Sequence, residues 1–407
     1  MTCRVHHPDA PGLDDLVVDP GRFVADSLFQ QPCWSPAAER ALDVERLATV
    51  EGLWADALQR HVRAPGFRLV RDGATLARAT YCRSAGVGHQ TIGDLIEPNR
   101  ALELHRAGAT MVLQGLQLTD PALARFTTNL ALALDHPVQI NAYLSPAEAR
   151  GLELHFDFHD VFVIQLAGAK RWRVWEPLDH TREPVRGISP AFVPPIDELG
   201  APLLDLTLQQ RGDCLYLPRG FPHAAETVES SSAHLTVGIM AVTWQHVVRQ
   251  ATRAAVAAGH LRASVPARSL DGAPAGRSGM PDLSALGDAL EPTQLRAWMA
   301  TEVWRRLPAT RLRPLAPPVV DLARPVVVTP GPLLWACPSS ASDGRIQLGL
   351  GDRRLDLPAE ALPLLAALLG APDGFVAADW AGPLDQCSQQ VVMDRLAAEG
   401  VIVHRAF

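Results

Sequence analysis

The residues best suited to chemistry are two histidines and one aspartate that stand close to apolar, strand-forming residues. His155 and Asp157 are two positions apart, so both side chains project from the same face of a strand. Such a pair also arises by chance in a protein with 14 histidines and 44 acidic residues, and residues 7–9 are a second example. His223 lies far downstream, after a Pro/Gly turn that ends another apolar segment. Two histidines and one carboxylate on a β scaffold form a ligand set that binds iron(II) and leaves coordination positions open, so these residues predict a metal site.

Lys170 is the only lysine in a protein that otherwise carries its positive charge on 36 arginines. The alternation of a strand sends Lys170, Trp172 and Val174 to one face and the residues between them to the other. A cation on an apolar inner face is costly unless an anion pairs with it. We therefore expect Lys170 to bind a carboxylate inside the protein.

Short apolar strands must position these residues. They are expected at residues 110–116, 138–144, 161–166, 170–175, 203–208, 213–218 and 234–242. In this part of the protein only residues 121–134 have the pattern of a helix. Many short strands separated by turn pairs such as Ala167-Gly168 predict a β-sandwich or barrel rather than alternating βαβ units.

The first half of the sequence divides into an extension and a barrel core. Residues 1–100 combine a predicted helix at 37–63 with a predicted strand and turn at 67–73, and we expect them to cap the barrel. Residues 101–243 hold the strands and the candidate metal ligands, so they are predicted to form the catalytic core.

The second half is predicted to contain a helical region, a linker and a small terminal module. Residues 244–312 hold a helix that runs through about 258, a Gly/Pro/Ser-rich stretch at 269–282 and a helix that ends near Leu307. The Pro-rich residues 313–325 are typical of a linker. The order of elements in the terminal module, residues 326–407, predicts a winged-helix-like domain. Its strands are expected at 345–350 and 353–358, and its helices at 359–369 and 389–399.

Four motifs surround the candidate ligands and Lys170. They are INAYLSP at 140–146, HFDFHDVFVIQLAGAKRWRVW at 155–175, GDCLYLPRGFPHAAET at 212–227 and SAHLTVG at 232–238. Together they resemble the JmjC-type ribosomal oxygenase family, also called the cupin-4 family, from about residue 108 to 242. The resemblance implies a mixed β and α fold, in which a double-stranded β-helix (jelly-roll) core is followed by a helical dimerisation region and a C-terminal winged-helix-like domain.

The resemblance further implies an Fe(II)- and 2-oxoglutarate-dependent peptidyl hydroxylase. It gives His155, Asp157 and His223 the role of iron ligands and catalytic residues, and Lys170 the role of binding the distal carboxylate of 2-oxoglutarate. In such a reaction O2 and 2-oxoglutarate are consumed, succinate and CO2 are released, and a carbon–hydrogen bond of the substrate is hydroxylated. The implied substrate is a protein or peptide, with an arginine or histidine β-carbon of a ribosomal protein as the target.

Further residues of the motifs are implied to bind the co-substrate. Asn141 and Tyr143, two apart on one strand face, match the family's Asn and Tyr near 2-oxoglutarate. Ser232 and His234 match pocket-lining residues near the co-substrate and the iron, although His234 is equally explained as a hydrogen-bonded core histidine. Residues 159–160 are expected to support the strand or the pocket rim.

Composition restricts the class of partner. The net charge is −7 and no run of basic residues occurs, which argues against nucleic-acid and anionic-membrane binding. No stretch is long and apolar enough for a membrane helix, and the N-terminus has no apolar signal region, so we expect a cytoplasmic protein. Six dispersed cysteines without a CxxC pair indicate reduced thiols. The expected partners are a protein or peptide substrate and a second copy of the same protein in a homodimer.

Three alternatives stay open at this point. The substrate can be a natural-product peptide that the enzyme tailors, instead of a ribosomal protein. The protein can be a non-catalytic metal-binding cupin regulator, although intact ligand and co-substrate residues argue against it. It can also be another cupin metalloenzyme, such as a sugar isomerase or three-histidine dioxygenase, but these need a different ligand set and no buried cation for oxoglutarate.

Overall fold

The computed structural model describes the barrel region and a C-terminal module. It covers residue 7, residues 10–262 except 60–62, 148, 150, 151 and 186–191, four isolated residues between 287 and 298, and residues 313–405 except 317, 330–335, 339–343, 351, 352 and 372. In these residues no helix is both long and apolar enough to cross a membrane. The Gly/Pro/Ser-rich stretch at 269–282 and the helix expected to end near Leu307 lie outside the described residues, apart from isolated positions.

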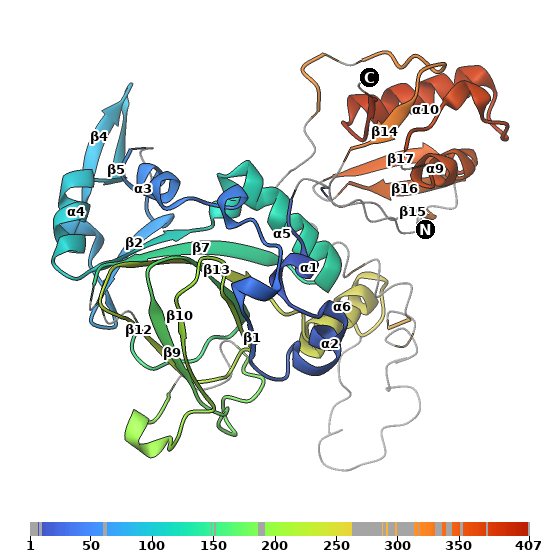
Figure 1. Cartoon of the computed structure of the whole chain (residues 1–407). Coiled ribbons are helices and arrows are strands. Elements are labelled where there is room, and N and C mark those ends of the chain that lie inside the picture. Colours follow the sequence, from blue (N-terminus) through green and yellow to red (C-terminus); the bar gives the residue numbers. More distant parts are fainter. Residues whose placement is uncertain are drawn as a thin grey trace, which may run out of the picture.

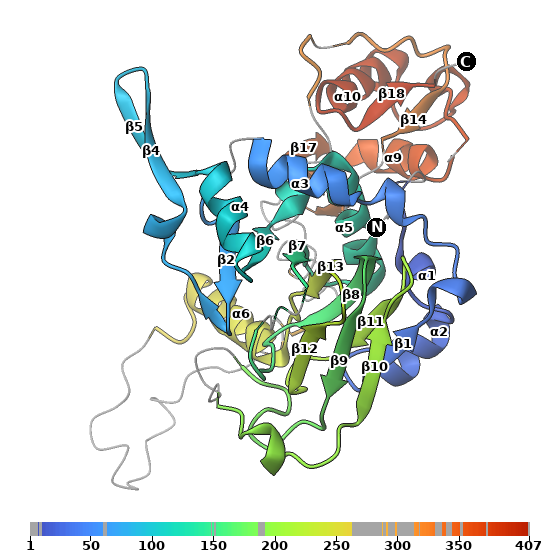
Figure 2. The same ribbon diagram turned by 60° about the vertical axis from the view of Figure 1, so that its left-hand side comes forward.

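Two antiparallel sheets form the core of the molecule (Figures 1 and 2). The larger sheet has the order β1-β11-β8-β13-β7-β6-β2-β3, with bounds Cys33–Ser35, Cys214–Leu217, Asp160–Ala167, Ser232–Ile239, Val138–Ser145, Thr110–Gln114, Phe67–Arg71 and Ala74–Thr75. The smaller sheet has the order β10-β9-β12, with bounds Leu204–Leu208, Lys170–Val174 and His223–Thr227. Side chains of both sheets, including Val163, Leu215 and Trp172, pack into one buried cluster. The jelly-roll core expected from the sequence is therefore confirmed.

Strand β9 has the predicted alternation of faces. Lys170, Trp172 and Val174 are buried between the sheets. Arg171 points outward and forms a bidentate ion pair with Asp205 of β10, with N–O distances of 2.7 and 2.6 Å. The exposed arginines of this strand therefore stabilise the sheet surface, whereas the lysine faces the interior.

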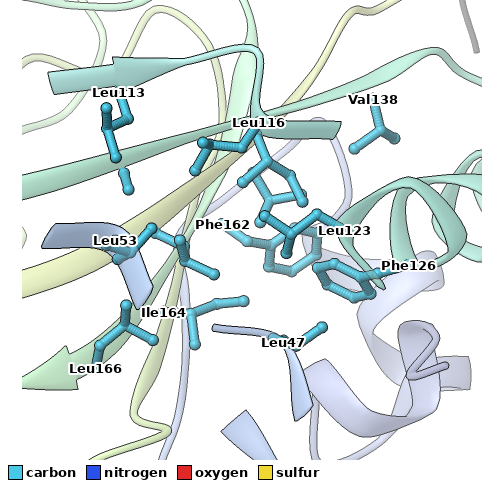
Figure 3. Close-up of a cluster of buried hydrophobic side chains, with 14 of the residues drawn as sticks. Leu47, Leu53, Leu113, Leu116, Leu123, Phe126, Val138, Phe162, Ile164 and Leu166 are labelled. Atoms are coloured by element: carbon cyan, nitrogen blue, oxygen red, sulfur yellow. The ribbon is translucent and has the colours of Figure 1, made fainter. Parts of the chain in front are cut away.

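Helix α5, Pro121–Leu134, packs on the outer face of the larger sheet. Figure 3 shows Leu123 and Phe126 of this helix beside Phe162 of β8. Each side chain of this size stabilises the fold by about 1.5–3 kcal/mol when it is fully buried. The helix has the bounds predicted from the sequence, because the Asp120 carboxylate accepts hydrogen bonds from the first helical turn at 2.7 and 3.0 Å. Strand β8 is consequently buried on both faces.

The seven strands predicted for the core are present, with boundaries shifted by three residues or fewer. The sequence does not predict β12, His223–Thr227, because its segment HAAET has little β propensity. Pairing with β9 imposes the extended conformation on it, with His223 opposite Val174 and Thr227 opposite Lys170. This strand holds His223 in the smaller sheet.

The N-terminal region differs from the expected helix at residues 37–63. Its α-helical part is α3, Val50–Gln59, preceded by two 3₁₀ turns at Ala37–Glu39 and Val44–Arg46. Arg40, between the turns, is extended, and its guanidinium donates to the carbonyl of Asp15 at 2.9 Å. Tertiary hydrogen bonds of this kind outweigh helix propensity, so the prediction of one continuous helix was wrong.

The same region supplies strands to the larger sheet instead of only covering it. Strand β2 pairs with β6 and turns at Asp72-Gly73, where both φ values are positive, into β3. The strand and turn predicted at residues 67–73 are therefore confirmed. The remaining elements are α1 (Leu13–Leu16), α2 (Pro20–Arg22), a π-helical turn (Phe23–Ser27), a hairpin of β4 (Cys82–Val87) and β5 (Gln90–Ile96), α4 (Pro98–Arg106), and 3₁₀ turns at Arg78–Thr80, Leu116–Leu118 and Ile196–Glu198.

After α6, Trp244–Ala257, the C-terminal module forms its own core. Its elements are β14 (Val326–Val328), β15 (Ala336–Pro338), β16 (Arg345–Gly349), β17 (Arg354–Pro358), α9 (Leu362–Leu369), α10 (Gln386–Ala398), β18 (Ile402–His404), and 3₁₀ turns at Ala359–Ala361 and Ala377–Asp379. The strands and helices predicted here are present. The last helix begins three residues early because the Asp385 carboxylate accepts from the backbone N–H of Ser388 at 2.7 Å.

Gly168, in the turn between β8 and β9, tests the close packing of the barrel. Its φ is +66°, and a Cβ atom there would lie 1.9 Å from the carbonyl oxygen of Ser231. We expect Gly168→Ala to lower the free energy of unfolding by more than about 2 kcal/mol, because backbone strain and the clash add. Gly200→Ala is the control, since φ there is +73° but no atom lies within 4 Å of the added Cβ. Equal losses in urea denaturation would contradict this packing.

Candidate metal centre and cavity

The three predicted metal ligands lie together. His155 and His223 form an isolated β-bridge, with N–O distances of 3.2 and 2.8 Å between their backbones. The Asp157 backbone carbonyl accepts from Gly220 in the loop before His223 at 2.9 Å. The ligand atoms of the three side chains are all within 4.8 Å of one another, and His223 Nε2 is 3.9 Å from the Asp157 carboxylate. The backbone thus brings together residues that are 66 positions apart in the sequence.

Hydrogen bonds fix the tautomers of both histidines. Nδ1 of His155 lies 2.6 Å from the carbonyl of Glu153, and Nδ1 of His223 lies 2.9 Å from the carbonyl of Phe221. A carbonyl only accepts, so Nδ1 carries the proton and Nε2 keeps the lone pair that a metal needs. Burial, and next the neighbouring His155, lower the pKa of His223 to about 4. The His223 ring is therefore neutral at pH 7, and the three groups suit a divalent metal ion.

A cavity of about 490 Å³ opens beside these ligands, between the two sheets. The Lys170 side chain lines it and is almost completely buried. Its Nζ is 3.5 Å from the hydroxyl of Ser145, which in turn accepts from Thr110 at 3.1 Å. In the described residues no carboxylate lies within 4 Å of Nζ, and burial lowers the pKa of Lys170 to about 8. An ammonium group in these surroundings is chemically suited to bind a carboxylate.

Asn141 and Tyr143 of β7 line the same cavity, as their spacing suggests. The Asn141 side-chain oxygen accepts from Gly115 N at 3.1 Å, which orients its amide. The Tyr143 ring stacks on His234 of β13, with centroids 4.9 Å apart and an interplanar angle of 4°. His234 also lines the cavity, and burial together with the charge of Lys170 lowers its pKa well below the usual value. These groups are neutral and form a flat polar wall.

Ser232 occupies a different place from the lining position expected for it. Its buried hydroxyl accepts from Gln165 Nε2 at 2.9 Å, and among the described residues it does not line the cavity. This hydrogen bond connects β13 to β8.

His159 and Asp160 have the supporting positions expected of them. His159 lines the cavity, and a Cβ added to Gly238 would lie 2.7 Å from its ring. Asp160 is fully buried and accepts from Tyr216 Oη at 3.1 Å and from Arg219 N at 3.2 Å. Burial raises the pKa of Asp160. Its hydrogen bonds connect β8 to the loop that leads to His223.

Several lining residues were missed from the sequence. Strand β2 contributes Arg68 and Val70, and the core strands add Gln114, Trp172 and Thr236. The segment FRLVR offers a signal for Arg68, because alternation places this cation on the inner face of the sheet. This alternation alone does not predict that Arg68 lines the cavity, because the pairing of β2 with β6 is what brings that face of the strand to the cavity.

Comparison with protein families identifies the barrel. Residues 116–247 match the JmjC domain model, and this segment contains the candidate ligands and Lys170. This part of the protein is a JmjC domain. The JmjC part of the resemblance noted in the sequence is therefore confirmed.

Curated proteins that are similar to this segment include ribosomal oxygenases. Ribosomal oxygenase 1 of Rattus norvegicus is 37% identical over 141 residues, which are 34% of this chain and 23% of that protein. The bifunctional lysine-specific demethylase and histidyl-hydroxylase NO66 of Drosophila yakuba is 41% identical over 103 residues, 25% of this chain and 15% of that protein. The match thus spans less than a quarter of the length of either relative.

Solved structures share the fold over almost the whole sequence. The ribosomal oxygenase YcfD of Escherichia coli is 17% identical, with a TM-score of 0.55, and the match covers 96% of this chain and 99% of that one. A structure of YcfD in complex with cobalt and 2-oxoglutarate is 18% identical with the same TM-score and the same coverage. The likeness therefore extends beyond the JmjC domain.

Removing one ligand tests the metal site. We expect His223→Ala to weaken cobalt(II) binding by at least about a hundredfold, because it removes one of three protein ligands that the fold positions. His159→Ala is the matched control, since His159 lines the same cavity outside the ligand cluster. Titration calorimetry measures both affinities. Equal affinities for the His223→Ala variant and the wild type would contradict the assignment.

Proposed function

We propose that this protein is an Fe(II)- and 2-oxoglutarate-dependent oxygenase that hydroxylates a side chain of a ribosomal protein. The observation that carries the proposal is one cavity that contains both the His155/Asp157/His223 cluster and the buried ammonium of Lys170. A metal site alone is common to many cupins, but a buried cation beside it fits a dicarboxylate co-substrate. The ribosomal oxygenases among the relatives support the substrate class.

The described residues fit both the metal and the co-substrate. Two imidazoles and a carboxylate make a three-ligand set, which leaves coordination positions open for 2-oxoglutarate and O2. When bound, the iron and its co-substrate supply the oxidising power that converts 2-oxoglutarate to succinate and CO2 and hydroxylates a carbon–hydrogen bond. The complex of YcfD with cobalt and 2-oxoglutarate supports this pairing in the same fold.

The protein's own groups orient and enclose the reactants. Lys170 and the hydroxyl of Ser145 hold the distal carboxylate of 2-oxoglutarate at the cavity floor. Asn141 and the stacked ring of Tyr143 shape the opposite wall. Trp172, packed against the rings of His223 and His234 at centroid distances of 6.1 and 5.8 Å, separates the floor from the metal ligands. The bulky ring of Trp172 also limits the space for water beside the metal ligands.

The domain assignments are also part of the proposal. We infer that residues 1–100 form an extension that also adds strands to the larger sheet, and that residues 101–243 form the catalytic core. Residues 313–325 are assigned to the linker, of which Val320 and Leu322 pack into the core of the terminal module. Residues 244–312 are assigned to dimerisation, which is supported by the exposed Trp244 and Val248 on one face of α6. Residues 326–407 are assigned to a winged-helix-like domain with a protein-binding or structural role, which the separate apolar core of the module supports.

Turnover of the co-substrate tests the enzymatic proposal. Purified protein with Fe(II), ascorbate and O2 is expected to convert 2-oxoglutarate to succinate, and His155→Ala is expected to reduce that rate by at least about a hundredfold, because the metal loses a ligand. Intact-mass comparison of ribosomal proteins from wild-type and deletion cells then tests the substrate, since one protein should gain the mass of one oxygen atom. Absence of iron-dependent succinate formation and of oxoglutarate binding would contradict the proposal.

A further inference from the structure

The formal charges that line the cavity are unbalanced. Its charged lining side chains are Arg68, Asp157 and Lys170. Under the proposed function Asp157 binds the metal and Lys170 binds the co-substrate. The positive charge of Arg68 is then the one left to face the substrate. Within the described residues no second carboxylate lines the cavity to balance it.

Arg68 is held in a fixed position. The register of β2, β6 and β7 places Arg68, Val112 and Tyr143 in one row on the inner face of the larger sheet. The Arg68 guanidinium donates to the phenolic oxygen of Tyr143, and its Nη1 donates to Thr75 Oγ1 at 3.4 Å. Its Nε is buried and has no hydrogen-bond partner in the described part of the protein. The contacts with Tyr143 and Thr75 therefore hold the positive charge of Arg68 beside the cavity.

The other polar groups of the cavity are uncharged. Gln114, Asn141 and Thr236 line it, and amide and hydroxyl groups both donate and accept hydrogen bonds. They suit a neutral polar side chain, whereas a guanidinium or ammonium group needs a carboxylate. The walls offer a cation hydrogen-bond acceptors, but among the described residues they offer no second carboxylate to balance its charge.

An adjoining cavity of about 390 Å³ shares His159 with the first one. Arg219 and Arg249 line it, and no acidic side chain does so among the described residues. Arg219 faces the buried Asp160 at 4.0 Å. Because Asp160 offsets the charge of Arg219, the remaining charge of this second cavity is the positive charge of Arg249. Both cavities are therefore electrostatically unfavourable for a cationic peptide segment.

We propose that Arg68 determines the class of the target residue: the cavity accepts an uncharged hydrogen-bonding side chain and rejects guanidinium and ammonium groups. The inference rests on the proposed function and decides between the arginine and histidine targets in favour of the neutral imidazole. A target arginine would place a second cation near Arg68, and like charges in a partly desolvated site oppose binding. A neutral imidazole nitrogen instead accepts a hydrogen bond.

Matched peptide pools test the inference. Two pools have the same randomised, uncharged flanking residues and differ only in a central histidine or arginine. With Fe(II), 2-oxoglutarate and ascorbate at pH 8, where histidine is neutral, mass spectrometry measures the gain of one oxygen atom. We expect wild-type protein to hydroxylate the histidine pool at least about tenfold faster than the arginine pool, as expected for one uncompensated like charge.

Variants of Arg68 assign the effect to this residue. Arg68→Gln is expected to abolish the preference, Arg68→Glu to reverse it and Arg68→Lys to keep it, because only the charge matters. Arg71→Gln is the matched control: this arginine belongs to the same strand but projects from its other face. Melting temperatures establish that each variant is folded, and the Lys and Glu variants still separate charge from structure if the Gln variant is unstable.

The outcomes separate the inference from the function on which it rests. Equal hydroxylation of both pools, preference for arginine, or no product from either pool while succinate still forms would overturn the inference and leave the oxygenase assignment standing. A wild-type preference that persists in both Arg68→Gln and Arg68→Glu would remove the role of Arg68. Absence of iron-dependent succinate in every reaction would contradict the proposed function itself.

Discussion

The burial of the Lys170 ammonium without a carboxylate partner is the constraint on which the site depends. This residue is only 3% exposed, its polar contact in the described residues is the Ser145 hydroxyl at 3.5 Å, and burial lowers its pKa to about 8. A cation in such a place costs stability in the absence of a ligand. A bound carboxylate would offset this cost, because a charge-assisted hydrogen bond to a buried ammonium group is strong and specific.

The strand register connects this cation to the metal ligands. In the smaller sheet Val174 of β9 is opposite His223, and Lys170 is four residues along the same strand. At about 3.3 Å per residue, the backbone positions of Lys170 and His223 are about 13 Å apart along the sheet. A shift of one residue between β9 and β12 would turn Lys170 or His223 away from the cavity. Tight turns such as the one at Gly168 therefore maintain both the fold and the positions of Lys170 and His223.

Much of the site was predictable because it depends on local alternation. The inward direction of Lys170 follows from strand geometry, and the structure has it. His155 and Asp157 lie together as predicted, but not on one strand: His155 forms an isolated β-bridge with His223, and Asp157 lies outside any strand. Helix α5 was predicted with its observed bounds because Asp120 and the following proline mark its start. Local pattern determines such features even when the remainder of the topology is unknown.

Features that depend on pairing between distant segments were not predictable. Strand β12 has an Ala-rich sequence and becomes extended through its partner β9. Arg68 lines the cavity because β2 pairs with β6. The Ser232 hydroxyl is instead hydrogen-bonded to Gln165 and does not line the described part of the cavity. The helix expected at residues 37–63 is interrupted by the tertiary hydrogen bonds of Arg40. In each case a contact between residues far apart in the sequence overrides the local preference.

The pH dependence of 2-oxoglutarate binding tests the central role of Lys170 most directly. Only the ammonium form attracts the carboxylate, and a pKa of about 8 in the free protein means that this form is lost as the pH rises above 8. Calorimetry on manganese-loaded protein without O2 should therefore show a Kd about tenfold higher at pH 9 than at pH 7, whereas Lys170→Arg should show little change over this range. A Kd that is constant with pH in the wild type, or the same dependence in both proteins, would contradict the role of this buried lysine.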